Sequence, residues 1–263
     1  MAEREEILSG GNMTAVVRVG NTVRRAAGPW TPTIHAFLRH LRAHGFDRVP
    51  EPLGMDERGR EIISLLPGAA PTYPLPEFAW SGETLEAVAR TLREYHDASA
   101  GFAGERWQWP AHEPREVICH NDFGPYNLMF EDGRLTGVID LDLASPGPRV
   151  LDVAYAAYRF VPLTDPANPD APFLGEDAQR RRLEAFCNAY GGQDPSAVVA
   201  SAAAKLREMV AFIEREAAAG DPAQKAVLER GDVAIYERDI AYLDEFPRDP
   251  RSIGQTQRPR RHK

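Results

Sequence analysis

The stretch HNDFGPYN at residues 120–127, followed by GVIDLD at residues 137–142, decides how this chain is interpreted. Apolar residues flank the first stretch, and a turn-forming segment separates it from a second apolar run. Two short strands should therefore bracket a loop and present Asp140 beside Asn127. Together with Asp122, these residues provide two carboxylates and one amide. Phosphoryl transfer needs a carboxylate to orient the acceptor hydroxyl, and oxygen ligands to hold magnesium against the phosphates.

The two motifs together resemble the catalytic signature of the aminoglycoside phosphotransferase family, whose members share the protein-kinase-like fold. The resemblance implies an α+β, two-lobe protein with a small β-rich N-terminal lobe and a larger, mainly helical C-terminal lobe. It implies that Asp122 is the catalytic base and that Asn127 and Asp140 are magnesium ligands. Asp142 and Asp152 match further acids of the family. The competing interpretation is a hairpin loop with a helix-capping acid and solvated carboxylates.

The first third of the chain should form a small α/β unit. Residues 14–19 and 21–25 favour a β-hairpin, and residues 33–44 have apolar side chains at helical spacing. A second hairpin is expected over residues 53–66, where a Pro-Gly pair ends it. The proline- and alanine-rich segment 68–76 is the predicted linker between the lobes.

The remaining two thirds should be mainly helical around the catalytic hairpins. Helices are expected over residues 84–99, from Asp194-Pro195 to Gly220, and over residues 232–246. The loop of residues 161–172 carries four prolines and is expected to be exposed.

Kinase-like lobes normally have a lysine on the third strand and a glutamate on the following helix, and this chain departs from both. The first lysine in the sequence is Lys205, so an arginine must supply any phosphate-binding cation on the strand. Strand alternation separates Arg24 from Arg25, and we choose Arg25 for the cleft. A guanidinium can hold two phosphate oxygens at once. The helix offers His35 near the place of the glutamate. A solvated arginine face is the alternative.

Nucleotide recognition by the backbone is expected at two further places. By resemblance, Ser64, Leu65 and Leu66 form the hinge strand that contacts the base through main-chain groups. The pair Gly10-Gly11 precedes the first strand and is a candidate turn over the phosphates. An apolar core strand and an ordinary turn are the respective alternatives.

Histidines and cysteines near the motif are assigned to structure rather than chemistry. His120 should support the catalytic loop, and His96 should be packed in the interior or cap its helix. Cys119 and Cys187 should be free buried thiols, because they are far apart in a chain without an export signal. No zinc-ligand spacing is present.

Composition excludes several classes of function. The 263 residues include 43% hydrophobic and 27% charged residues, with a net charge of −8. This charge argues against nucleic-acid binding, and no apolar run is long enough to span a membrane. The domain prediction is a nucleotide-binding lobe at 1–67, a catalytic and acceptor-binding lobe at 68–246, and a disordered basic tail at 247–263. Acidic side chains that could supply negative charge to an acceptor site are Glu176, Asp177, Glu184, Glu208, Glu214, Glu216 and Asp221.

The sequence therefore predicts a cytoplasmic O-phosphotransferase that uses ATP or GTP and Mg²⁺. Its acceptor would be a small hydroxyl-bearing molecule, and the acidic body suits a cationic one. The rival is a catalytically weak nucleotide-binding or scaffold pseudokinase. The missing lysine and glutamate favour this rival, whereas the complete set of Asp122, Asn127 and Asp140 favours an enzyme.

Overall fold

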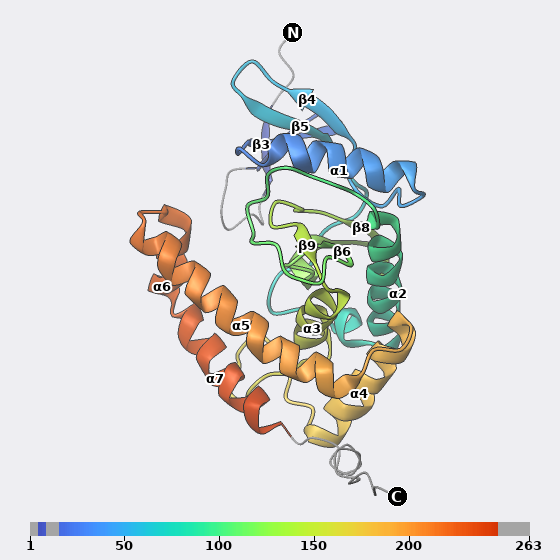
Figure 1. Ribbon diagram of the computed structural model, residues 1–263, viewed down its shortest axis with the longest axis vertical. Helices are drawn as coiled ribbons and strands as arrows, with labels where there is room; N and C mark the ends of the chain where they lie inside the picture. Colours follow the sequence, from blue (N-terminus) through green and yellow to red (C-terminus); the bar gives the residue numbers. More distant parts are fainter. Residues whose placement is uncertain (1–4, 9–15, 247–263) are drawn as a thin grey trace, which may run out of the picture.

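The structure, a computed structural model, describes residues 5–8 and 16–246. The expectations for Gly10-Gly11 and for the tail at 247–263 concern residues outside these ranges. Figure 1 shows a sheet with one helix at the N-terminal end of the molecule and a larger helical part below it. The predicted α+β, protein-kinase-like arrangement is confirmed.

A five-stranded antiparallel sheet forms the N-terminal part, in the order β1-β2-β3-β5-β4. Its strands are β1 (Glu6–Leu8), β2 (Val16–Val19), β3 (Thr22–Ala26), β4 (Pro52–Met55) and β5 (Arg60–Ser64). Gly20 turns the β2–β3 hairpin with a φ of 59°, which glycine adopts without steric cost. Pairing of β3 with β5 places Arg25 opposite Glu61.

Helix α1 (Thr31–Ala43) follows the hairpin and begins with a proline in its first turn. Its buried face includes Ile34, Phe37, Leu38 and Leu41, as the apolar spacing predicted. The same face also buries His35, which therefore points to the interior near the sheet.

Helices dominate the C-terminal part (Figure 1). The elements in chain order are η1 (Glu77–Trp80), α2 (Gly82–Ser99), β6 (Val117–Cys119), η2 (Pro125–Asn127), β7 (Leu128–Glu131), β8 (Arg134–Val138), β9 (Ser145–Gly147), α3 (Arg149–Phe160), α4 (Glu176–Tyr190), α5 (Pro195–Ala218), α6 (Pro222–Arg230) and α7 (Asp232–Glu245). The β7–β8 hairpin and the β6–β9 strand pair lie between the helices and the sheet (Figure 1). The helices expected at 84–99, 195–220 and 232–246 are confirmed as α2, α5 and α7. Helices α4 and α6 were not foreseen.

The hairpin β7–β8 carries the candidate site on its open end. Asp132 and Gly133 form its turn with φ of 50° and 74°, conformations that Asp and Gly tolerate better than other residues. At the other end, the Ile139 N–H donates to the Asn127 carbonyl at 2.9 Å. The loop before β7 and the loop after β8 are thereby held side by side.

The expectation that the loop of residues 161–172 is exposed is wrong for residues 161–164 and for Asn168, which are buried. Val161 and Leu163 are fully buried, and Asn168 is 6% exposed. The reason is a buried carboxylate on α7: Asp239 accepts from the Asp165 N–H and from Asn168 Nδ2, both at 2.7 Å. Prolines exclude regular structure here, but they do not prevent the loop from packing.

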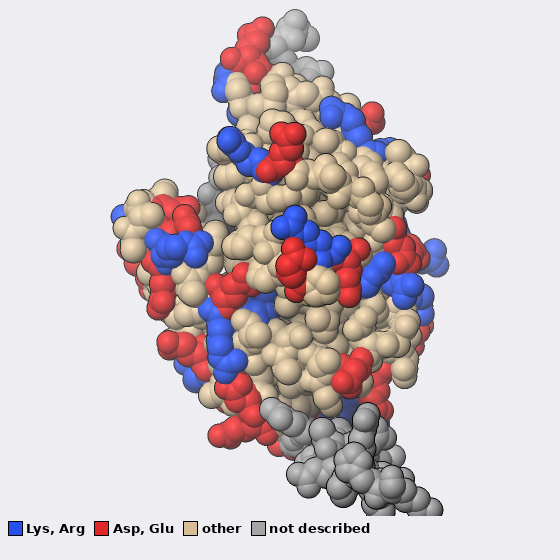
Figure 2. All heavy atoms as spheres, viewed as in Figure 1, with Lys and Arg blue, Asp and Glu red and all other residues tan. Residues whose placement is uncertain are grey.

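Both cysteines lie in the interior, and charged residues of both signs lie on the surface (Figure 2). Cys119 and Cys187 are buried free thiols, as predicted. On the face seen in Figure 2, acidic and basic side chains are interspersed. Within residues 5–8 and 16–246, no helix has the length and apolar content to cross a bilayer.

Candidate active site

Asp122 lies in the loop between β6 and η2, where both of its carboxylate oxygens accept hydrogen bonds. Tyr126 donates its hydroxyl to Oδ1 at 2.6 Å, and Asn127 Nδ2 donates to Oδ2 at 3.0 Å. Burial raises the pKa of Asp122, while the Tyr126 hydrogen bond and the nearby His120 oppose that rise. The Asn127 amide uses its nitrogen as the donor here, so its Oδ1 is left as a ligand for a cation.

Asp140 follows β8 with a left-handed φ of 59° and a side chain that is half exposed. Asp142 lies two residues further on, and burial raises its pKa to about 6 although the Arg25 charge lowers it. Arg25 Nη1 contacts Asp140 at 2.8 Å and Arg25 Nη2 contacts Asp142 at 2.7 Å. One arginine of the sheet thus contacts both carboxylates of the IDLD motif at residues 139–142.

Glu61 completes the environment of Arg25 and was missed by the sequence analysis. Arg25 Nε lies 2.5 Å from Glu61 Oε1, and His35 Nε2 lies 2.9 Å from Glu61 Oε2. Glu61 is 1% exposed. Burial by itself would lower the pKa of Arg25, but Asp142, Asp140 and Glu61 raise it above the ordinary arginine value. The glutamate partner of the strand cation therefore comes from β5 rather than from the helix.

Asp152 at the start of α3 fixes the backbone of the loop of residues 120–127, which is the candidate catalytic loop. It accepts from the N–H groups of His120 and Asn121 at 2.5 and 2.7 Å. His96 Nε2 lies 3.0 Å from the same carboxylate, and its Nδ1 lies 2.7 Å from the Tyr190 hydroxyl. Burial raises the pKa of Asp152, but the hydrogen bonds from His96 and from the His120 N–H outweigh this effect, so the pKa lies below its ordinary value.

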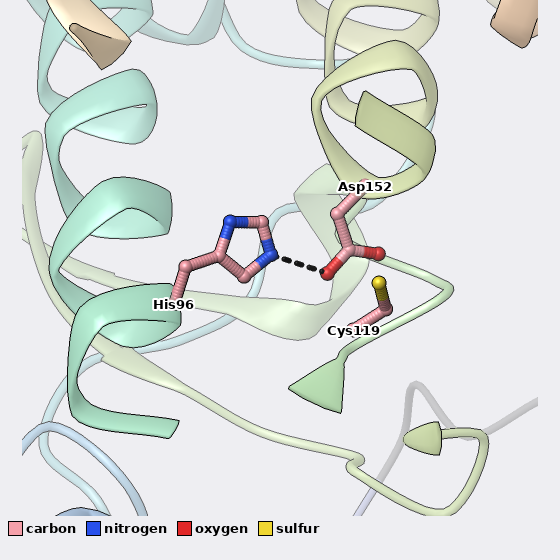
Figure 3. A group of neighbouring side chains, drawn as sticks. All are labelled: His96, Cys119 and Asp152. Atoms are coloured by element: carbon pink, nitrogen blue, oxygen red, sulfur yellow. Dashed lines mark hydrogen bonds and ion pairs between the residues drawn. The ribbon is translucent and has the colours of Figure 1, made fainter. Parts of the chain in front are cut away.

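Ligand atoms of His96, Cys119 and Asp152 lie within 4.8 Å of one another, as a metal site would require. Figure 3 shows His96 directed at Asp152, with the Cys119 thiol beside the carboxylate. Both ring nitrogens of His96 and both oxygens of Asp152 already have partners. Burial holds the pKa of Cys119 well above the ordinary thiol value, whereas a metal ligand must be a thiolate. This cluster therefore supports the catalytic loop and does not fit a metal ion.

His120 connects the loop that carries Asp122 with the segment that carries Asp140. Its Nε2 lies 3.0 Å from the Ile139 carbonyl, and its Nδ1 accepts from the Asp122 N–H at 3.3 Å. The side chain is fully buried among aromatic rings. These contacts hold Asp122 and Asp140 at a fixed separation, which agrees with the structural task expected of His120.

Lys205 reaches the catalytic loop from α5. It is 1% exposed, its Nζ donates to Asn121 Oδ1 at 2.9 Å, and it lies 4.2 Å from the centre of the Trp109 ring. Asn121 has a left-handed φ of 67°, and its Nδ2 donates to the Leu143 carbonyl and to Ser145 Oγ. Lys205 therefore orients the amide that connects the loop of Asp122 with the segment after Asp142.

The hinge candidates differ in their backbone engagement. The Ser64 N–H donates to the Glu51 carbonyl, and the Leu65 N–H donates to the Asn21 carbonyl, both at 2.9 Å. Within the described ranges, the Leu66 main chain makes no hydrogen bond to other protein groups. Of the three residues, Leu66 is the one whose N–H and C=O are open to a ligand.

Comparisons with known proteins agree with this architecture. The model of the phosphotransferase enzyme family matches residues 105–198, which contain Asp122, Asn127 and Asp140. A trifolitoxin immunity protein from Rhizobium leguminosarum bv. trifolii is 34% identical over 197 residues, or 71% of this chain and 74% of that protein.

Two solved structures illustrate the likeness in fold. An amicoumacin kinase in complex with AMP-PNP and Ca²⁺ has a TM-score of 0.65 at 13% identity, covering 94% of this chain and 90% of that one. A putative aminoglycoside phosphotransferase from Ralstonia eutropha has a TM-score of 0.60 at 17% identity, covering 94% of each chain. The fold is that of the protein-kinase-like phosphotransferases.

The chain belongs to the phosphotransferase enzyme family. This finding confirms the resemblance on which the sequence analysis relied. Family and fold together support a small-molecule phosphotransferase.

Proposed function

We propose that this protein transfers the γ-phosphate of ATP or GTP to a hydroxyl group of a small acceptor molecule. The observation that carries the proposal is the convergence of Asp122, Asn127 and Asp140 at one end of the β7–β8 hairpin, beneath Arg25 of the sheet. Phosphoryl transfer depends mostly on positioning and charge stabilisation, and these four residues supply both.

Asp122 is assigned to the acceptor side. Its carboxylate would accept or orient the proton of the attacking hydroxyl, and Asn127 Nδ2 holds one of its oxygens in place. Tyr126 donates its hydroxyl to the other oxygen of Asp122. The acceptor hydroxyl would approach the Asp122 carboxylate from the side on which Tyr126 lies.

Magnesium fits the oxygen donors of the site. Asn127 Oδ1 and the half-exposed carboxylate of Asp140 are the hard ligands that this ion prefers. When bound, the ion would supply positive charge that neutralises the phosphates. Arg25 would steady the phosphate oxygens with its guanidinium fork, and it would then share Asp140 with the metal.

The nucleotide base is assigned to the segment after β5. The N–H groups of Ser64 and Leu65 donate to the Glu51 and Asn21 carbonyls, so of the three residues Leu66 is the one that would offer its N–H to a base. Support for a nucleotide donor also comes from the structural neighbour, which was solved with AMP-PNP.

An assay of nucleotide turnover with a panel of hydroxyl compounds tests the proposal. Asp122→Asn keeps the shape of the side chain but loses the proton acceptor, so we expect a rate at least roughly a hundredfold lower. Nucleotide affinity should stay close to that of the wild type. Transfer at the wild-type rate in this variant would refute the assignment. Failure of the wild type to bind any magnesium nucleotide would favour the scaffold alternative.

A further inference from the structure

Arg159, in the last turn of α3, is a buried cation whose hydrogen-bond partners are tyrosine hydroxyls. It is 9% exposed. Its Nε and Nη2 donate to the Tyr155 hydroxyl at 3.3 and 3.1 Å, and Nη2 also donates to the Tyr236 hydroxyl at 3.0 Å. Tyr73 adds a further phenol contact. A charge in such a place normally requires an ionic partner.

Aromatic rings surround this guanidinium. Its central carbon lies 4.9 Å from the ring centre of Tyr158, 5.4 Å from that of Tyr155, and 5.7 Å from those of Tyr126 and Tyr236. The negative faces of aromatic rings attract cations, most strongly where water is excluded. The rings therefore stabilise Arg159 in the positive state without an ion pair.

No carboxylate among the described residues bonds to the Arg159 guanidinium. Asp239 is engaged by the Tyr158 hydroxyl at 2.6 Å and by Asn168. Asp170 lines a small pocket together with Arg159, Tyr73 and Trp80, without an ion pair to the arginine. Asp122 and Asp239 interact with this charge only at longer range, so the guanidinium has no direct ion pair within the described residues.

The arginine lies on the acceptor side of the candidate site. The Tyr155 hydroxyl, which Arg159 holds, is 2.7 Å from the Tyr126 hydroxyl, and Tyr126 in turn donates to Asp122 at 2.6 Å. Tyr126 and Tyr236 are each partly exposed, so the tyrosines around Arg159 are in contact with solvent beside Asp122. A molecule whose hydroxyl meets Asp122 would extend along these tyrosines towards Arg159.

Building on the proposed function, we propose that Arg159 and its tyrosines form an anion-binding subsite for the acceptor. The acceptor would carry a carboxylate or a phosphate group in addition to its reacting hydroxyl. A carboxylate gains charge-assisted hydrogen bonds from the guanidinium, whereas an ammonium group at the same place meets a like charge in a medium of low dielectric constant. The subsite therefore selects against the cationic acceptors that the acidic composition suggested.

Matched probes test this proposal on the full chain. Short ω-hydroxy acids of increasing length are compared with ω-amino alcohols of the same lengths, by calorimetry in the presence of Mg²⁺ and AMP-PNP. We expect a hydroxy acid to bind the wild type more tightly than its amino alcohol. Arg159→Gln should lower the affinity for the hydroxy acid by roughly tenfold or more, because the carboxylate loses a charge-assisted hydrogen bond. Tighter binding of the amino alcohols, no binding of any acid, or unchanged acid binding in Arg159→Gln would each overturn the proposal.

Two further variants keep the test valid if Arg159→Gln does not fold. Arg159→Lys retains the charge without the planar fork, so it should keep the preference for acids at reduced affinity. Tyr236→Phe removes one hydroxyl partner but leaves the cation, so the preference should persist. Loss of the preference in both folded variants would show that the arginine charge does not select the ligand.

Nucleotide titrations separate this subsite from the donor site. Arg159→Gln should change the affinities for ADP and AMP-PNP by the same small factor. A selective loss of AMP-PNP affinity would show that Arg159 contacts the γ-phosphate, which contradicts an acceptor subsite. Absence of nucleotide binding in the wild type would refute the proposed function, whereas the comparison of acid and amine probes without nucleotide would still decide on the anion site.

Discussion

Arg25 and Glu61 lie directly opposite each other on neighbouring strands, and their side chains form an ion pair at 2.5 Å. The same arginine continues to Asp140 and Asp142, which lie more than a hundred residues further along the chain. A single side chain thus connects the sheet with the IDLD motif. The pairing matters because it directs the guanidinium towards Asp140 and Asp142, where we propose that the phosphates bind.

Substitution of Arg25 tests whether this side chain binds phosphate. Arg25→Ala should weaken triphosphate binding more than nucleoside binding, since only the phosphates lose a partner. Arg24→Ala is the matched control, because Arg24 bonds to Thr22 of its own strand. Affinities from calorimetry should be compared with thermal stability, because Arg25→Ala also leaves Glu61 buried without its ion pair. A greater loss of triphosphate affinity in Arg24→Ala would show that Arg24, and not Arg25, is the phosphate-binding cation.

Replacement of His96 should change how stability depends on pH. Burial lowers the pKa of His96 below 6.5, although the hydrogen bond to Asp152 opposes this shift. Below this value the unfolded chain takes up a proton that the folded chain does not, so stability falls as the pH decreases. The slope contributed by this group is up to about 1.4 kcal/mol per pH unit.

Urea unfolding at neutral and mildly acidic pH measures the effect. His96→Gln retains a donor towards Asp152 but does not titrate, so its stability should vary less with pH than that of the wild type. Identical pH profiles for His96→Gln and the wild type would contradict the assignment of a neutral, buried imidazole.

Lys205 should influence the order of the catalytic loop from its position on α5. Lys205→Met fills a similar volume over Trp109 but leaves Asn121 Oδ1 without its donor, at a cost of about 1–3 kcal/mol. We expect faster hydrogen exchange in residues 120–127 and weaker magnesium-nucleotide binding. Lys225→Met, on the exposed surface of α6, should change neither property. Unaltered exchange in Lys205→Met would show that the loop is positioned without this lysine.

The sequence was sufficient for the local parts of the site and insufficient for the distant ones. Asp122, Asn127 and Asp140 lie within one loop and hairpin, so strand periodicity and turn residues were enough to place them together. Arg25 was chosen from alternation, and the structure directs it towards Asp140 as that choice required. Glu61 could have been found by pairing the strands, because it faces Arg25 across the sheet.

Residues that act from remote helices left no comparable signal. Lys205 meets Asn121 across 84 positions of sequence, and its helix packs against α3. In the sequence, Arg159 is indistinguishable from any charged residue of an amphipathic helix. In the structure, tyrosines from three other segments surround it. Helical spacing predicts which face is buried, but it does not predict which partner the buried polar group will meet.

Asp140→Ala tests the central claim most directly, because it concerns the metal and nucleotide site without requiring a known acceptor. The measurement is calorimetric titration of Mg²⁺ with AMP-PNP into the wild type, Asp140→Ala and the control Glu131→Ala. Glu131 is an exposed acid of the same hairpin. We predict that Asp140→Ala loses most of the magnesium-dependent affinity, while Glu131→Ala retains it. Equal affinity of the wild type and Asp140→Ala would contradict the proposed phosphotransferase site.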